Sequence, residues 1–281
     1  MTPEDWVQSV GRAELALAVA VAGFVVMTAA VVPLAGQARP AFEIPVRDVT
    51  DGEGLDRSTG EAWNEVPAAT VPLSSSGAAV PNADDVTVER VSVAAARSDE
   101  RLYLRLSWAD KTRDTNTTQV RRFADAVAVQ LPAEATARPP VTMGSTDNRV
   151  NVWYWDGSGA TQELLAGGPG TTTQFAESTV RTNATHTDGR WQVVLSRPLS
   201  AASENRTAVP TDADMDIALA VWNGSNMERS GQKAVSEWYY LALGPGPQGP
   251  PYETILWAVA GIGIVVTTLV TIEGVRRTRS E

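Results

Sequence analysis

Two long uncharged apolar runs, one near each end of the chain, constrain its architecture more than any other feature. The first run is Leu15–Ala35 and the second is Thr254–Ile272. A helix needs about 20 apolar residues to cross the hydrocarbon core of a bilayer. We therefore predict two single transmembrane helices, at residues 13–36 and 253–273, with an outer domain at residues 37–252 between them.

The charges beside the two runs predict which side of the membrane each segment occupies. The C-terminal tail, residues 274–281, carries three arginines, and the N-terminal segment, residues 1–12, ends in Arg12. Basic residues beside a span favour the cytoplasmic side. We therefore expect a protein of the cell membrane with both termini in the cytoplasm and the main domain outside.

One alternative stays open for the first run. Gly36-Gln37-Ala38 has small residues at its first and third positions, a pattern typical of signal-peptide cleavage sites. Cleavage there would leave a mature protein that begins near Arg39 and has one anchor. Because the run is long for a signal peptide and its basic flank is weak, we favour a retained span.

Composition excludes most kinds of metal and acid–base chemistry. The chain has no cysteine and one histidine, His186. It therefore has no disulfide, no thiolate metal site, no covalently attached haem and no site that needs two histidines. His186 precedes an Asp-Gly turn, and we expect it on the solvated surface. The formal net charge of -10 argues against a nucleic-acid partner, because few cations are free to replace the counterions of phosphates.

The basic residues are unevenly chosen. Of 23 lysines and arginines, only Lys111 and Lys233 are lysine. Few lysines together with an excess of acids suit a salt-adapted exterior, and we expect a protein of a halophile. In a chain that prefers arginine so strongly, a retained lysine is informative.

Between the two runs, apolar and polar residues alternate in short segments, the pattern of half-buried strands. The segments are 86–94, 102–108, 126–131, 150–155, 191–195, 215–222 and 237–243. Asp188-Gly189 predicts a hairpin turn, and residues 160–170 are expected to form a loop. Many short strands with few helical stretches predict an all-β domain with the fold of an antiparallel β-sandwich.

Two stretches of this domain have residue combinations that a generic sandwich does not need. In Pro140–Trp155, the pair Met143-Gly144 precedes an aromatic strand. In Asn226–Leu241, the polar turn Arg229–Lys233 leads into a second aromatic strand.

These stretches resemble the haem b-binding γ subunits of the ethylbenzene dehydrogenase and dimethylsulfide dehydrogenase group. Members of that group belong to molybdopterin enzyme complexes of the DMSO-reductase type. The similarity includes Phe123–Pro132 and covers roughly residues 40–245. It implies one non-covalent haem b that sits between the sheets, with Met143 and Lys233 as axial ligands of the iron.

The chemistry of the two side chains suits this implied role. A thioether is a soft ligand that favours ferrous iron. A lysine ligates as the neutral amine, which burial favours, whereas an arginine does not lose its proton in proteins. Without the resemblance, Lys233 would be expected as a solvated turn residue and Met143 as a core side chain. Met227 is the rival thioether.

Other residues beside the two ligand stretches are candidates for contact with the haem. Arg149 and Arg229 are candidates to pair with its propionates, and Asn151 and Ser230 are candidates to donate hydrogen bonds. Aromatic residues of the flanking strands are expected to line the pocket wall: Trp153, Trp155, Trp238 and Tyr240.

The sequence and the resemblance together predict a membrane-anchored b-type cytochrome subunit. It is expected to transfer electrons to or from an extracytoplasmic molybdopterin and iron–sulfur oxidoreductase of the nitrate, chlorate or dimethylsulfoxide type, without catalysing a reaction itself. Its expected partners are an iron–sulfur subunit, a molybdopterin catalytic subunit, a membrane quinol-oxidising cytochrome and membrane lipid. The alternative function is a non-haem extracellular β-sandwich module that binds carbohydrate or a surface partner.

Overall fold

The computed structural model describes residues 41–116, 118–134, 138–201, 203–244, 260–261 and 263–264. Nearly all of them belong to one compact unit, Pro40–Gly246. Within these ranges no helix is both long and apolar enough to cross a membrane. The span predicted at residues 13–36, with its signal-peptide alternative, lies outside the described residues, and so does most of the span predicted at residues 253–273.

The regular elements of the described domain are almost all strands, so the all-β prediction is confirmed. In chain order the strands are β1 (Glu43–Asp48), β2 (Ala68–Pro72), β3 (Ser74–Ser75), β4 (Arg90–Arg97), β5 (Arg101–Ala109), β6 (Ala126–Pro132), β7 (Val150–Asp156), β8 (Thr161–Ala166), β9 (Thr173–Gln174), β10 (Arg181–Thr187), β11 (Arg190–Pro198), β12 (Met215–Trp222), β13 (Ala234–Val235) and β14 (Tyr239–Ala242). Two short 3-10 helices, η2 (Glu61–Glu65) and η3 (Gly224–Asn226), interrupt the connections.

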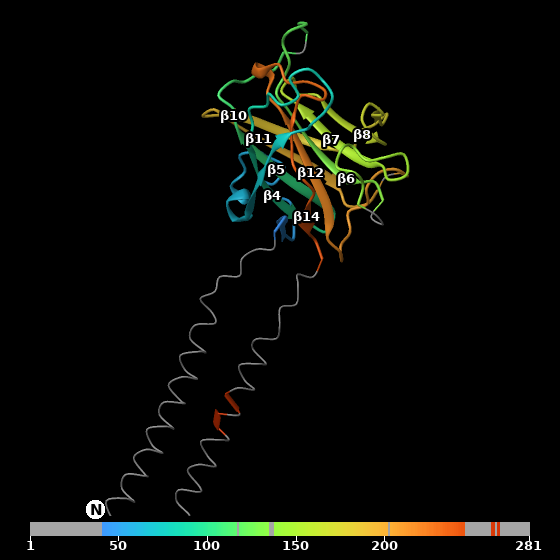
Figure 1. Cartoon of the computed structure of the whole chain (residues 1–281). Coiled ribbons are helices and arrows are strands. Elements are labelled where there is room, and N and C mark those ends of the chain that lie inside the picture. Colours follow the sequence, from blue (N-terminus) through green and yellow to red (C-terminus); the bar gives the residue numbers. More distant parts are fainter. Residues whose placement is uncertain are drawn as a thin grey trace, which may run out of the picture. The chain divides into compact units, whose positions relative to one another are not determined.

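These strands form one curled, mixed sheet in which two groups of strands face each other (Figure 1). The first group has the order β10-β11-β5-β4, with β2 also paired to β4. The second has the order β14-β12-β6-β7-β8-β9, with β13 paired to β12 and β3 paired to β13. We call them the β5 group and the β6 group.

Strand β1 joins the two groups. Its first half pairs with β14, through Glu43 opposite Tyr240, and its second half pairs with β4, through Val46 opposite Ala95. Both pairings are parallel, so the prediction of a purely antiparallel arrangement is wrong for them. Pro45 lies where β1 changes partners, as expected for a residue that cannot donate to a ladder. Alternation identifies strands, but it does not reveal the direction of their pairing.

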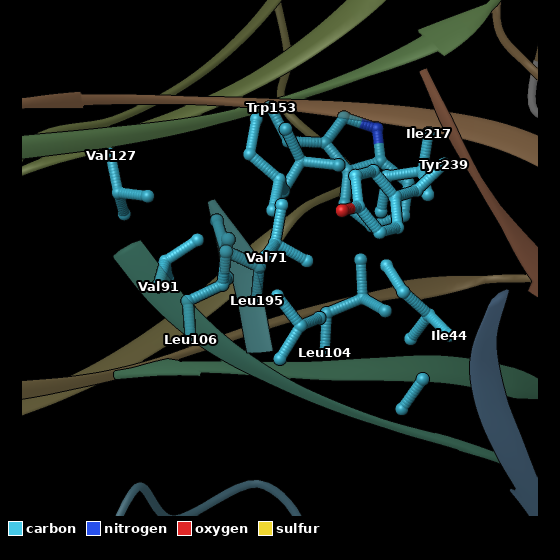
Figure 2. Close-up of a cluster of buried hydrophobic side chains, with 14 of the residues drawn as sticks. Ile44, Val71, Val91, Leu104, Leu106, Val127, Trp153, Leu195, Ile217 and Tyr239 are labelled. Carbon is cyan, nitrogen blue, oxygen red and sulfur yellow. The ribbon is translucent and has the colours of Figure 1, made fainter. Parts of the chain in front are cut away.

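The main hydrophobic core lies between the two groups (Figure 2). Side chains from both contribute to it, including Leu104, Leu106 and Leu195 from the β5 group and Val127, Trp153 and Ile217 from the β6 group. Successive side chains of a strand point to opposite faces. The alternate residues of β6, β7 and β12 therefore point away from this core. Together with Ala166 of β8 and with Trp238 they form a second cluster, which we call the outer cluster: Ala128, Val150, Val152, Ala166, Ala218 and Trp238.

Three local features predicted from the sequence are the turn at Asp188-Gly189, the loop at residues 160–170 and the exposure of His186. The hairpin turn at Asp188-Gly189 is confirmed, because both residues have positive φ and join β10 to β11. The prediction that residues 160–170 form a loop is wrong for Thr161–Ala166, which form β8 and pair with β7. His186 is only half exposed: its Nε2 lies 2.9 Å from the carbonyl oxygen of Asp110, and its ring packs edge-on against Trp191.

Candidate functional site

The structure brings Met143 and Lys233 into contact. The Nζ atom of Lys233 lies 3.9 Å from the Sδ atom of Met143, although the two residues are 90 positions apart in the chain. Met143 lies in the turn before β7, and Lys233 directly precedes β13. Both side chains are partly buried.

The turn that carries Met143 needs a glycine after it. Met143 has a φ of 70° and Gly144 a φ of 74°, so both occupy the left-handed region. A Cβ at Gly144 would lie 2.6 Å from the carbonyl oxygen of Asn148. The turn is closed by a bond from the Gly144 amide to the Pro140 carbonyl (2.9 Å), and the Gly168 amide donates to the Met143 carbonyl (2.9 Å). The glycine of the Met-Gly pair is therefore a backbone requirement of this turn, whereas Met143 adopts a conformation that its own Cβ disfavours.

The turn that carries Lys233 is tied to segments far away in the chain. Ser76 holds it twice, because its Oγ donates to the Gly231 carbonyl (2.5 Å) and its amide donates to the Lys233 carbonyl (3.1 Å). The side chain of Gln232 donates to the carbonyl of Asp85 (3.0 Å). These bonds fix the backbone from which the lysine side chain projects.

The environment of the Lys233 amine is apolar and aromatic. Its Nζ lies 5.2 Å from the centre of the Trp222 ring. Among the described residues, no acid forms an ion pair with it. Burial lowers the pKa of Lys233, because a charged amine is poorly solvated there. This environment favours the neutral amine, the form that ligates a metal.

The Met143–Lys233 pair lies on the outer face of the β6 group. Met143 and Trp222 both pack against the outer cluster, on the face of β6, β7 and β12 that points away from the main core. The pair therefore does not lie between the two groups of strands, where the resemblance placed the cofactor. Which face of a sheet holds a pocket depends on the side that the flanking loops cover. The alternation of apolar and polar residues in the strands does not predict that side.

Asn151 and Trp153 point to the opposite face of β7 from the pair. Trp153 is fully buried in the main core, and Trp155 also belongs to it. The Oδ1 atom of Asn151 accepts hydrogen bonds from Trp153 Nε1 (3.2 Å) and Arg197 Nη1 (2.8 Å). The structure therefore does not bring these side chains to Met143 and Lys233, and Asn151 instead belongs to a buried charged network.

That network contains two arginines and one carboxylate. Arg197 of β11 and Arg206 each lie 3.3 Å from a carboxylate oxygen of Glu163 in β8. The Glu163 side chain has no exposed surface, and its Oε2 also accepts from the amide and hydroxyl of Thr179, each at 2.9 Å. The network links the β5 group to the β6 group through the core.

The remaining predicted contact residues lie near the two ligand turns but at the surface. Arg149 is exposed. Arg229 is also exposed, and its guanidinium lies 4.8 Å from the centre of the Phe123 ring. Ser230 contributes its carbonyl, which accepts from Trp222 Nε1 at 3.2 Å. Met227, the rival thioether, is 46% exposed.

Four aromatic residues, two of them predicted for the site, can also be placed. Trp238 belongs to the outer cluster, against which Met143 packs, whereas the hydroxyl of Tyr240 donates to the carboxylate of Glu43, its partner on β1. Tyr154 and Trp222 were not predicted as site residues, yet their rings meet edge to face on the outer face, with centres 5.8 Å apart. Period-two spacing from Val150 and Val152 places Tyr154 on that face, so the signal was present in the sequence.

A buried carboxyl, Asp125, supports the start of the lysine segment. Its Oδ1 accepts from the amide of Gly224 (2.9 Å), the first residue of η3. Its Oδ2 accepts from the amide of Asp114 (2.8 Å) and from Trp191 Nε1 (2.9 Å). Burial raises the pKa of Asp125 to about 6, although these hydrogen bonds oppose the shift.

Comparison with known proteins identifies the family. The family model described as ethylbenzene dehydrogenase matches residues 60–178 and 169–234, more than half of the chain. The chain belongs to the ethylbenzene dehydrogenase family. The family resemblance predicted from the sequence is therefore confirmed.

Three relatives of the chain are named as haem or γ subunits. A protein of Haloferax mediterranei named as a respiratory nitrate reductase heme subunit, ORF7, is 55% identical over 93% of this chain and 95% of its own length. The chlorate reductase subunit gamma of Ideonella dechloratans is 34% identical, over 67% of this chain and 80% of its own. The dimethylsulfide dehydrogenase subunit gamma of Rhodovulum sulfidophilum is 30% identical, over 75% and 85%.

Solved structures are more distant. A carbohydrate-binding module of family 9 from Caldicellulosiruptor kristjanssonii, in complex with glucose, covers 74% of this chain and 100% of its own, with 13% identity and a TM-score of 0.42. This likeness is too low to carry an argument about function.

Proposed function

We propose that this member of the ethylbenzene dehydrogenase family is a b-type cytochrome subunit that carries electrons for a respiratory oxidoreductase complex. Met143 and Lys233 would be the axial ligands of one non-covalently bound haem b, which supplies a reversible one-electron change between ferric and ferrous iron. The chain itself binds the group, orients it and excludes water. It makes and breaks no substrate bonds.

The contact between Met143 and Lys233 carries this proposal. A thioether sulfur and a neutral amine nitrogen are both donor atoms that could hold a haem iron. The Nζ and Sδ atoms lie 3.9 Å apart, although the two residues are far apart in the chain. The lowered pKa of Lys233 and the apolar outer cluster beside Met143 suit a neutral amine and a buried macrocycle.

The exposed arginines beside the two turns suit the acidic edge of a haem. Arg149 and Arg229 flank the pair, and a guanidinium is well matched to a propionate. Asn151 and Trp153 would act indirectly, through the opposite face of β7.

The names of the relatives support a place in a molybdenum enzyme complex. They are subunits of nitrate reductase, chlorate reductase and dimethylsulfide dehydrogenase. We assign this chain an iron–sulfur subunit and a molybdopterin catalytic subunit as partners, and a quinol-oxidising cytochrome as a further electron partner. The sandwich-like domain would be held outside the cell by the spans at residues 13–36 and 253–273. Protease added to intact cells is expected to degrade this domain and spare both termini, and a protected domain would reject this topology.

The two lysines of the chain provide a matched test of the haem ligand. The purified wild type is expected to show a Soret band, and acid acetone is expected to extract the haem because no cysteine can bind it covalently. Lys233→Arg keeps the charge but offers no neutral amine, so it is expected to abolish low-spin ligation. Lys111→Arg makes the same change at an exposed position and is expected to leave the spectrum intact. An unaltered low-spin spectrum in Lys233→Arg would reject the ligand, and a haem-supplemented wild type without a Soret band would reject the cytochrome.

A further inference from the structure

Two tryptophans of the outer face are arranged alike with respect to the two ligand turns. The indole Nε1 of Trp222 donates to the carbonyl of Ser230, three residues before Lys233 (3.2 Å). The indole Nε1 of Trp238 donates to the carbonyl of Pro139, four residues before Met143 (2.9 Å). Each of these two indoles therefore holds the backbone of one turn, and neither bonds to both.

We infer that Trp222 and Trp238 are positioning residues, and that each sets the placement of one ligand independently of the other. This inference rests on the proposed haem function.

The packing around Trp222 explains why it acts on the lysine. It is the last residue of β12, and its ring also lies 5.2 Å from the Lys233 amine. Tyr154 also packs against this ring, in an edge-to-face contact with an interplanar angle of 75°. A side chain that bonds the backbone of a turn and also contacts its ligand side chain restricts both. Loss of its N–H leaves the Ser230 carbonyl without this donor.

The packing around Trp238 explains why it acts on the methionine. Trp238 is 9% exposed and belongs to the outer cluster, against which Val141 and Met143 pack. Its bond to Pro139 fixes the start of the Met143 turn, and Gln130 fixes the middle by donating to the Val141 carbonyl at 3.1 Å. Trp238 thus holds the thioether side of the site.

Opposite effects on the reduction potential separate positioning from general loosening. A thioether favours ferrous iron, and an amine is a harder ligand that favours ferric iron. A weakened methionine therefore lowers the potential, whereas a weakened lysine raises it. A change that only admits water to the site acts on both ligands together and shifts the potential in the same direction for either variant.

The test uses the full-length holoprotein with Trp222→Phe and Trp238→Phe, which keep an aromatic ring but remove the indole N–H together with part of the ring volume. Each loses about one neutral hydrogen bond, so the population in which the affected ligand is detached is expected to rise about fivefold. We expect Trp222→Phe to raise the haem potential and to weaken the amine signature in the near-infrared and paramagnetic resonance spectra. We expect Trp238→Phe to lower the potential and to weaken the sulfur-to-iron charge-transfer band.

Shifts of the same sign, or no shift in either variant, would overturn the inference while the wild-type haem spectrum still supported the proposed function. A wild type without a Soret band would overturn both. Thermal unfolding of the two apoproteins, expected to remain cooperative, confirms that each variant folds.

Discussion

The buried charge of Glu163 offers a direct test of how the two groups of strands are held together. Its carboxylate serves both Arg197 and Arg206 at 3.3 Å, and the exposed fractions of the three side chains are 0%, 1% and 9%. Glu163→Gln keeps the volume but leaves two buried guanidinium groups without a counter-charge. Breaking one buried ion pair costs about 3–5 kcal/mol, and we expect the upper end of that range because two arginines depend on this carboxylate.

The expected loss is a large part of the stability of an ordinary domain, which is about 5–15 kcal/mol. In urea unfolding of the purified protein followed by tryptophan fluorescence, a slope near 2 kcal/mol/M converts the loss into a fall of the midpoint by about 2 M. Glu89→Gln is the matched control, because Glu89 pairs with Arg90 at 3.7 Å with both side chains more than 70% exposed. That change is expected to cost less than about 1 kcal/mol. A midpoint for Glu163→Gln within about 0.5 M of the wild type would mean that water reaches the two guanidinium groups and that the burial argument fails.

Two further predictions concern the backbone of the methionine turn and a buried acid. Gly144→Ala is expected to lower the melting temperature and to detach Met143 from the haem, because its Cβ would lie 2.6 Å from the Asn148 carbonyl oxygen. Gly77→Ala is the control for backbone strain alone, because Gly77 has a φ of 62° and open space around a Cβ. The control is expected to cost about 1 kcal/mol. Equal melting temperatures for the two variants would contradict the clash. Burial raises the pKa of Asp125 to about 6, so folding takes up a proton and the contribution of this group to stability falls as the pH rises from 3.8 through 6. Carbon-13 NMR of the Asp125 carboxyl is expected to show a midpoint near 6, and a midpoint below 4 would refute the shift.

The sequence was informative wherever the relevant signal is local. Alternation located the principal strands of both groups, and the Asp188-Gly189 turn follows from the preference of those residues for positive φ. Strand β8 escaped notice because its sequence, TQELLA, has adjacent leucines and no period-two pattern. The parallel pairings of β1 were also out of reach, because they depend on which distant strands lie beside it.

The candidate site shows the same division between local and non-local information. Met143 and Lys233 were chosen through a family resemblance, and the structure shows that they touch. Asn151 and Trp153 lie in the same motif, but they are one or three positions away from Val150 and Val152. Since Val150 and Val152 point to the outer face, Asn151 and Trp153 face the core. The motif indicates which residues lie near the site, and the pleat of β7 determines which of their side chains point to the face that carries Met143.

The pairing of β1 with β14 means that the domain begins and ends at one place. Glu43, near its first described residue, lies opposite Tyr240, near its last, and the two strands run in the same direction. Domains whose ends lie close together tolerate insertion into another chain and circular permutation. The chain therefore enters and leaves this domain through two adjacent strands, β1 and β14. A short linker between these ends, with new termini cut in an exposed loop, would preserve all of its strand pairings.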